Sequence, residues 1–246
     1  MWEGVFNNFK EAGGDLDAFE SDTWINKQKD KICHHLYQLE NVALGVSKDY
    51  PLSIVVSMLL SQQDKVSIMD FGGGMGFQYL ELLAKVPLAK EKVMYAIVDG
   101  KQTLDALPNQ MRMYRNLHFS TTLEMFKNSF DIVHIGSTLQ YIENWRELLH
   151  NLNHRYQPKY FVFSDLLAGD IPTFTSHQLF YGKKIPHLFL NWNEFANYMS
   201  SDLGFLVHFK SKFIHNILNQ EDIFPNFGIP PTHQIDRGLN VIFCRQ

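Results

Sequence analysis

The feature that most constrains the fold of this chain is a glycine-rich turn between an apolar run and a helical pattern. The run 66–71 ends in Asp70-Phe71, the turn reads Gly72-Gly73-Gly74-Met75-Gly76, and apolar residues at helical spacing follow over 77–83. This order predicts a strand, a tight turn and a helix. Glycine suits such a turn because it adopts positive φ and lets a ligand approach the backbone, while the helix N-terminus presents unpaired N–H groups.

The spacing of the glycines separates two kinds of ligand. Gly72, Gly74 and Gly76 give Asp-x-Gly-x-Gly-x-Gly, whereas the dinucleotide fingerprint is Gly-x-Gly-x-x-Gly. A carboxylate at the end of the strand suits a ligand that carries an amine better than it suits a diphosphate. The pattern resembles motif I of the class I S-adenosylmethionine (SAM) dependent methyltransferases. The alternative is an ordinary βα turn that happens to be rich in glycine.

Apolar runs that alternate with helical segments predict the architecture. Five such runs are found at 66–71, 93–98, 117–120, 130–135 and 160–165. Their alternation with helices predicts a parallel sheet with right-handed crossovers. Two further strands are expected at 205–213 and 238–245. This layout resembles the Rossmann-like class I methyltransferase fold, an α/β fold with a mostly parallel seven-stranded sheet and an antiparallel last strand.

The remaining segments are predicted to surround this core. Residues 1–64, with helices at 24–39 and 51–61, are expected to form an N-terminal helical cap within the same domain. Residues 65–246 would form the SAM-binding core. Within it, 166–190 has no clean periodicity and is predicted to be an irregular substrate loop, since long loops in compact domains are usually functional. A second irregular insert is predicted at 214–237.

Composition limits the partners and the compartment. The formal net charge of −4 over 246 residues provides no basic footprint for nucleic acid. Only Cys33 and Cys244 are present, which indicates a reducing compartment and no cysteine zinc site. No signal peptide is visible and no apolar run reaches the ~20 residues needed to span a bilayer. We therefore predict a cytoplasmic protein without membrane insertion; the oligomeric state stays open.

Ligands of open α/β sheets bind outside the carboxyl ends of the strands, so the SAM site is predicted at that edge. Asp99, at the end of the second strand, can accept hydrogen bonds from both ribose hydroxyls, although Asp99-Gly100 could also be a simple turn. The family resemblance assigns adenine contacts to 120–121 and methionine contacts to 136–137. The predicted cofactor residues are Asp70, Gly72, Gly73, Gly74, Gly76, Asp99, Gly100, Ser120, Thr121, Gly136 and Ser137.

Methyl transfer from a sulfonium requires alignment, exclusion of water and, for a hydroxyl acceptor, a general base. His177 in the predicted substrate loop is the first candidate for this base, and Asp165 at the end of the fifth strand is the second. His134, within the fourth strand, fits a hydrogen-bonded core histidine better. No metal is predicted, because the segment Asp165-Leu166 lacks the Asp-Asn pair of metal-dependent catechol-type methyltransferases.

The resemblance extends to a little-characterised bacterial family of SAM-dependent methyltransferases. It rests on 2–6, Phe19-Glu20-Ser21-Asp22 with Trp24, the glycine turn and Leu139-Gln140-Tyr141-Ile142. The family is associated with surface-polysaccharide or secondary-metabolite pathways. The resemblance therefore implies a small polar acceptor, such as a sugar, nucleotide-sugar or glycan hydroxyl, with S-adenosylhomocysteine (SAH) as product. Two alternatives remain open, namely an NAD-dependent oxidoreductase and a non-catalytic SAM-binding protein.

Overall fold

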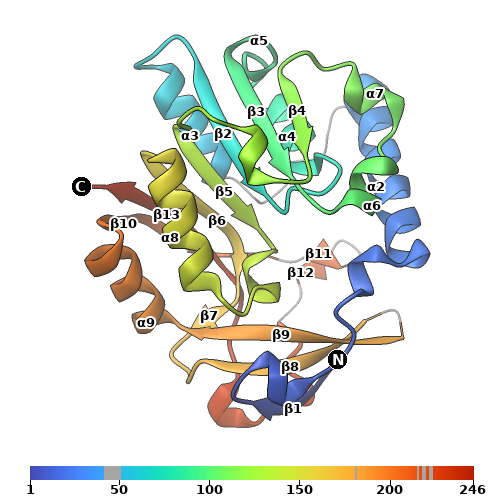
Figure 1. Ribbon diagram of the computed structural model, residues 1–246, viewed down its shortest axis with the longest axis vertical. Helices are drawn as coiled ribbons and strands as arrows, with labels where there is room; N and C mark the ends of the chain where they lie inside the picture. Colours follow the sequence, from blue (N-terminus) through green and yellow to red (C-terminus); the bar gives the residue numbers. More distant parts are fainter. Residues whose placement is uncertain (42–50, 181, 215, 218–219, 222–223) are drawn as a thin grey trace.

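The centre of the molecule is a seven-stranded sheet, seen in a computed structural model that describes residues 1–41, 51–180, 182–214, 216–217, 220–221 and 224–246. The strand order is β10-β13-β6-β5-β2-β3-β4 (Figure 1). The strands are β2 (Val66–Phe71), β3 (Val93–Val98), β4 (Leu117–Ser120), β5 (Ile132–Gly136), β6 (Tyr160–Leu166), β10 (Phe205–Lys212) and β13 (Leu239–Arg245). All seven predicted strands are present, within a few residues of the expected bounds.

The pairing directions confirm the predicted topology. Strands β4, β3, β2, β5 and β6 pair in parallel, while β13 lies antiparallel between β6 and β10. The parallel order reverses between β2 and β5, because the chain passes from β4 at one edge back to the middle of the sheet. This reversal is a topological switch point, where the carboxyl ends of parallel strands leave a crevice for a ligand.

Helices cover both faces of the sheet, because its strands carry apolar side chains on both sides. Ile68 packs with α2 (Asp22–Asn41), α3 (Pro51–Leu60) and α4 (Phe77–Lys85) in one core cluster. Its neighbour Met69 packs on the opposite face with α8 (Trp145–Tyr156) and α9 (Trp192–Asn197). Since successive strand residues point to opposite faces, one strand supplies both cores. The shorter helices are α1 (Phe9–Ala12), α5 (Ala89–Lys92), α6 (Lys101–Asp105) and α7 (Asn109–Arg112).

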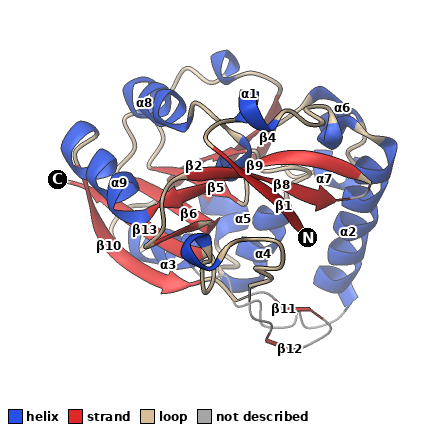
Figure 2. Ribbon diagram, turned by 90° about the horizontal axis from the view of Figure 1, so that it is seen from below, coloured by secondary structure: helices blue, strands red, loops and turns tan. Residues whose placement is uncertain are grey.

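A second, smaller sheet corrects the prediction of an irregular loop at 166–190. Its order is β1-β8-β9-β7, with β1 (Trp2–Phe6), β7 (Ala168–Gly169), β8 (Phe174–Phe180) and β9 (Lys183–Asn191). The sequence of β8 does not alternate between apolar and polar side chains, so it does not predict a strand. The reason is that β8 buries consecutive residues, including the polar Thr175, Ser176 and His177. Seen from below, β1, β8 and β9 cross in front of the large sheet (Figure 2).

The predicted helical cap therefore begins with a strand of this small sheet. Trp2 pairs with Gln178 of β8, and its indole N–H donates a 2.7 Å hydrogen bond to the carbonyl of Pro225. Trp2 thus joins the N-terminus to the 214–237 insert, which contains β11 (Asn216–Ile217), β12 (Gln220–Glu221) and the 3-10 turn η5 (Pro231–His233). Parts of the predicted segments, namely 42–50, 181, 215, 218–219 and 222–223, lie outside the described residues.

Candidate functional site

The glycine turn leaves β2 in a conformation that only small residues accommodate. Gly72, Gly74 and Gly76 have φ values of 70°, 59° and 92°. A Cβ on Gly73 would lie 2.4 Å from Oδ2 of Asp70, and one on Gly72 would lie 2.3 Å from the Thr138 side chain. A Cβ on Gly74 would meet nothing within 4 Å, so this part of the turn borders open space. The turn therefore packs closely on its inner side and is open on the other.

Asp70 anchors the turn from below through a buried polar network. Its side chain is 1% exposed, and its two oxygens lie 2.7 Å from Nδ1 of His134 and 2.7 Å from the donating hydroxyl of Tyr95. Nε2 of His134 lies 3.2 Å from Oγ of Ser164, so the histidine bridges three strands. His134 is therefore a hydrogen-bonded core histidine, as its position in the sequence predicts.

Asp99 holds the turn from the side. Its Oδ2 accepts a 2.8 Å hydrogen bond from the N–H of Gly74, and its Oδ1 accepts a 2.7 Å bond from the N–H of Gly100. Burial raises the pKa of Asp99, while these hydrogen bonds and one from Thr103 lower it; burial is the largest effect. A half-buried carboxylate is thus fixed at the end of β3 with part of its hydrogen-bonding capacity still available to a ligand.

The ends of β5 and β6 carry two residues in left-handed backbone conformations. Ser137 has φ 49° and Asp165 has φ 56°. The Ser137 hydroxyl donates a 2.9 Å hydrogen bond to Oδ2 of Asp165. Left-handed conformations cost energy for residues other than glycine, and they concentrate at functional sites. No local sequence signal marks this pairing, because Ser137 follows β5 and Asp165 lies 28 residues further on, at the end of β6.

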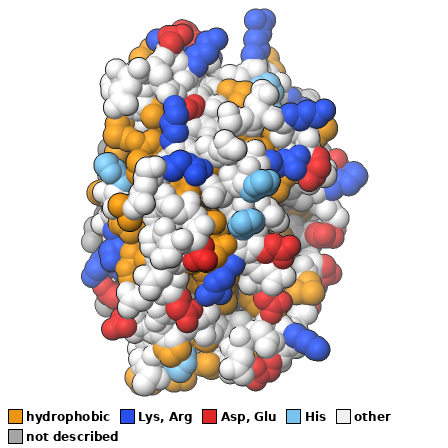
Figure 3. Space-filling model, turned by 60° about the vertical axis from the view of Figure 1, so that its left-hand side comes forward, with side chains coloured by type: hydrophobic (Ala, Val, Ile, Leu, Met, Phe, Trp, Pro, Cys, Tyr) orange, Lys and Arg blue, Asp and Glu red, His pale blue; other side chains and the backbone are white. Residues whose placement is uncertain are grey.

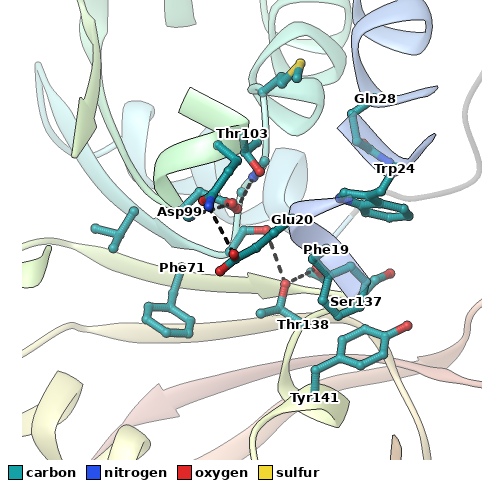
Figure 4. Close-up of a pocket in the computed structure, with 18 of the residues that line it drawn as sticks. Phe19, Glu20, Trp24, Gln28, Phe71, Asp99, Thr103, Ser137, Thr138 and Tyr141 are labelled. Atoms are coloured by element: carbon teal, nitrogen blue, oxygen red, sulfur yellow. Dashed lines mark hydrogen bonds between the residues drawn. The ribbon is translucent and has the colours of Figure 1, made fainter. Parts of the chain in front are cut away.

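These elements surround a cavity of about 720 Å³, within the ~300–1,000 Å³ range of small-molecule sites. Figure 4 shows Asp99 and Thr103 on one side and Tyr141, Ser137 and Phe19 on the other. The predicted site residues that line the cavity are Asp70, Gly72, Gly73, Gly74, Asp99, Gly100, Thr121, Gly136 and Ser137.

Two predicted cofactor residues lie outside the lining. Gly76 begins α4 beneath the turn, where a Cβ would lie 2.8 Å from Cε of Met111, so its smallness serves packing. Ser120 is buried and its hydroxyl donates to the carbonyl of Thr122. Both positions support the turn and the end of β4 from behind the cavity.

His177, the first candidate for the base, also lies outside the cavity. It stands on β8 instead of on an irregular loop, is 7% exposed, and has Nε2 3.3 Å from the carbonyl oxygen of Gly13. Its ring packs against Phe6 with centroids 5.0 Å apart. His177 therefore has no access to a molecule in the cavity. Asp165 is not in the lining either, but Ser137 connects it to the cavity wall.

One wall of the cavity, which we call the aromatic wall, consists of Phe19, Trp24, Tyr141 and Phe180. Ring centroids are 5.1 Å apart for Phe19 and Trp24, 4.6 Å for Phe19 and Tyr141, and 5.9 Å for Trp24 and Phe180. These residues come from the 3-10 turn η1 (Ala18–Glu20), from α2, from the 3-10 turn η3 (Leu139–Tyr141) and from β8. Sequence reasoning missed Trp24 and Phe180 as site residues because only the tertiary fold brings these segments to one place.

The charges of the cavity are mainly negative. Asp15, Glu20, Asp70 and Asp99 belong to the lining, and Lys31 is its one lysine or arginine among the described residues. The Lys31 ammonium lies 3.9 Å from the ring centroid of Phe77. Glu20 also accepts a 3.0 Å hydrogen bond from the Gln102 amide, which links the N-terminal segment to α6 above the cavity. Such a lining favours a ligand with positive charge near the turn.

Other kinds of site find little support in the described part of the chain. No group of three or more His, Cys, Asp or Glu side chains there is arranged to hold a metal ion. Within the same residues, no helix combines the length and apolar character needed to cross a bilayer. The face drawn in Figure 3 intersperses acidic and basic side chains and shows no continuous basic area.

No protein-family model matches the chain, and no curated protein matches it closely enough to count as a relative. Solved structures do. A Burkholderia thailandensis 1,6-didemethyltoxoflavin-N1-methyltransferase with bound SAH is 13% identical, with a TM-score of 0.53, over 91% of this chain and 89% of the other. A Methanosarcina mazei SAM-dependent methyltransferase is 13% identical, with a TM-score of 0.53, over 82% and 99%.

A third similar structure is the magnesium protoporphyrin IX methyltransferase of Synechocystis PCC 6803 with bound SAM. It is 13% identical, with a TM-score of 0.50, over 94% of this chain and 95% of the other. The chain has the class I SAM-dependent methyltransferase fold. The predicted fold class is therefore confirmed. Identities this low establish the fold, whereas the reaction must be argued from the cavity itself.

Proposed function

We propose that the protein is a SAM-dependent methyltransferase that acts on a small molecule. The observation that carries the proposal is the carboxylate of Asp99, held by the N–H groups of Gly74 and Gly100 at the rim of the cavity. A carboxylate in this place can accept hydrogen bonds from ribose hydroxyls. The structures with bound SAM and SAH that share the fold support the same ligand.

The residues of the cavity fit SAM. A ligand can approach the turn on the open side of Gly74. On the inner side, Gly72 and Gly73 pack closely against Thr138 and Asp70. Asp70 and Asp99 place negative charge beside a ligand that carries a sulfonium and an ammonium group. Thr121, Gly136 and Ser137 would line the remaining length of the ligand.

When bound, SAM supplies an electrophilic methyl group, whose bond electrons return to sulfur as the lone pair of the acceptor takes the carbon. The chain must then align the acceptor, exclude water and remove a proton. We propose that Asp165, and not His177, is the general base. The proton of the acceptor would pass to the carboxylate of Asp165 through the Ser137 hydroxyl. A metal-independent reaction remains our prediction.

The proposal specifies a small-molecule acceptor and does not specify its chemical class. A sugar, nucleotide-sugar or glycan hydroxyl, and with it a role in polysaccharide biosynthesis, rests on the family resemblance alone. The acceptor would lie against the aromatic wall, between the N-terminal cap and the small sheet. The cap of residues 1–64 would thus belong to the acceptor site of the same domain.

Two other functions make different predictions. An NAD-dependent oxidoreductase needs a place for a diphosphate at the turn, where Asp70 and Asp99 contribute negative charge instead. A non-catalytic SAM-binding protein would need the ribose contact of Asp99 but no proton acceptor behind Ser137. The hydrogen-bonded Ser137 and Asp165 favour the enzyme.

Calorimetric titration with SAM, SAH and NAD tests the proposal. We expect SAM and SAH to bind, NAD to bind at least about a hundredfold more weakly, and Asp99→Ala to weaken SAH by about tenfold or more, the loss of a charged hydrogen bond. Asp105→Ala, on exposed surface of α6, is the matched control. Binding of NAD without SAH would refute the proposal, and unchanged SAH affinity in Asp99→Ala would refute the ribose contact.

A further inference from the structure

We propose that the methyl acceptor is a planar aromatic molecule without negative charge, bound against the aromatic wall. The inference deepens the proposed methyltransferase function and rests on it. It concerns the part of the cavity away from Asp99, where Phe19, Trp24 and Tyr141 meet (Figure 4).

The shape of the wall favours a flat ring. Phe19 contacts Trp24 and Tyr141 with interplanar angles of 69° and 72°, so the rings form an angled apolar surface instead of one closed stack. Leu16, Ile142 and Ile185 extend the same apolar lining. Aromatic ligands gain from such surfaces through burial and through edge-to-face or offset contacts.

The hydroxyl groups of Tyr141 in the wall and of Thr138 beside it are engaged with the protein. The Tyr141 hydroxyl donates a 2.8 Å bond to Gln178, and burial raises the pKa of Tyr141, so it stays protonated. The single proton of the Thr138 hydroxyl lies between two carbonyl oxygens, that of Gly136 at 2.9 Å and that of Gly72 at 3.2 Å. A sugar would bury several hydroxyls against these groups, and a buried hydroxyl without a partner is costly. The aromatic faces therefore offer few partners to a hydroxyl-rich acceptor, whose hydroxyl groups would have to reach the carboxylates of Asp15 and Glu20 beside the wall.

The charges decide against an anionic acceptor. Around the wall the described lining contributes the carboxylates of Asp15 and Glu20, and Lys31 lies over Phe77 near the glycine turn. Lys183 approaches Asp15 at 3.6 Å but does not line the cavity. Diphosphates are bound by lysine, arginine or backbone N–H groups, and an unpaired buried anion is strongly disfavoured. A nucleotide sugar at the wall would thus meet two carboxylates, and the described lining offers Lys31 as the one lysine or arginine that could compensate its charge.

A charge series on one ring system tests the inference. The probes are 5-hydroxyindole, which is neutral, 5-hydroxytryptamine, which is cationic, and 5-hydroxyindole-3-acetate, which is anionic, with UDP-glucose and glucose beside them. Calorimetric titrations are run with and without saturating SAH. We expect the neutral and cationic indoles to bind at least about tenfold more tightly than the anionic indole, UDP-glucose or glucose, one like-charge contact being worth about this much.

Either sugar binding more tightly than every hydroxyindole would overturn the inference, as would no binding of any hydroxyindole. Failure of SAH to bind would instead overturn the proposed function, while the order within the series, measured without SAH, still decides the acceptor class.

Two variants locate the effect. Glu20→Lys should raise affinity for the anionic indole about tenfold. Asp30→Lys, at an exposed position of α2 outside the cavity, makes the same change of charge and should leave this affinity unaltered. Trp24→Ala should weaken the neutral indole by about tenfold and Trp24→Phe by less, with SAH affinity retained in both. Equal effects of Glu20→Lys and Asp30→Lys would show that only net charge acts, contrary to the inference.

Discussion

The hydroxyl of Ser137 and the carboxylate of Asp165 form a 2.9 Å hydrogen bond across the ends of two adjacent parallel strands, and both residues have left-handed backbone conformations. Ser137 lines the cavity and Asp165 lies behind it. Two left-handed residues other than glycine lower the stability of the folded state, and such residues concentrate at functional sites.

The first prediction concerns proton removal. Asp165→Asn keeps the shape of the side chain and one amide oxygen that can accept the hydrogen bond of Ser137, but it removes the basic carboxylate. We expect kcat for methyl transfer to fall about 10²-fold or more, because a positioned base contributes ~10²–10⁴-fold. SAH affinity, measured by calorimetry, should change less than about twofold. An unaltered kcat would exclude Asp165 as the proton acceptor.

The second prediction concerns backbone strain. At position 137, Gly should give a more stable protein than Ala by about 1 kcal/mol in chemical denaturation, the reverse of the usual order, because Ala keeps the strained Cβ. The control is Gln157, the left-handed residue at the end of α8, with φ 47°. There the same reversal is expected with methyl transfer unaffected, whereas both variants at 137 should lose it. Equal stability of the Gly and Ala variants would mean that position 137 carries no strain.

The third prediction follows from the buried position of Asp99. Burial raises its pKa above the ordinary 3.8. Between the two values the folded protein binds a proton that the unfolded chain has released, so the contribution of Asp99 to stability decreases as the pH rises through this interval. SAH affinity should change in the opposite sense, because the ionised carboxylate accepts the ribose hydrogen bonds. Chemical denaturation and calorimetric SAH binding, each measured from about pH 4 to pH 7, should show the fall in stability and the rise in affinity. Asp99→Asn should abolish both trends.

The fourth prediction concerns the buried pair of Asp70 and His134. His134→Ala leaves a carboxylate that is 1% exposed without this partner, and we expect a loss of about 3–5 kcal/mol in the free energy of unfolding. Asp70→Asn in the same background should restore part of it. His118→Ala, an exposed histidine on β4, should change stability by less than about 0.5 kcal/mol. A loss no larger than that of the control would show that the pair is not stabilising.

The large sheet could be predicted because its signals are local. Continuous apolar runs such as 93–98, ended by Asp99-Gly100, identify buried parallel strands without tertiary information. The glycine turn is likewise a local requirement, since positive φ at 72, 74 and 76 restricts these positions to glycine. For this reason most of the predicted cofactor residues do line the cavity.

The small sheet could not be predicted because its signals are non-local. Strand β1 contains Gly4 at φ 80° and a register shift between Glu3 and Phe6, so it has no regular strand pattern of its own. Strand β8 buries Ser176 and His177, which tertiary contacts satisfy in part through the carbonyls of Gly4 and Gly13. The incorrect loop prediction at 166–190 led directly to His177 as the base.

The bond between Trp2 and Pro225 also fixes an order of assembly during synthesis. The two residues are 223 positions apart, so at ~5–20 residues per second about 11–45 s pass between their emergence from the ribosome. Until β8 (Phe174–Phe180) has also emerged, the first strand lacks its pairing partner, whereas the glycine turn and Asp99 are made earlier and lie close together in sequence. The small sheet can thus close only after the parallel strands of the large sheet have been made, and Trp2 stays without its Pro225 acceptor until late in synthesis.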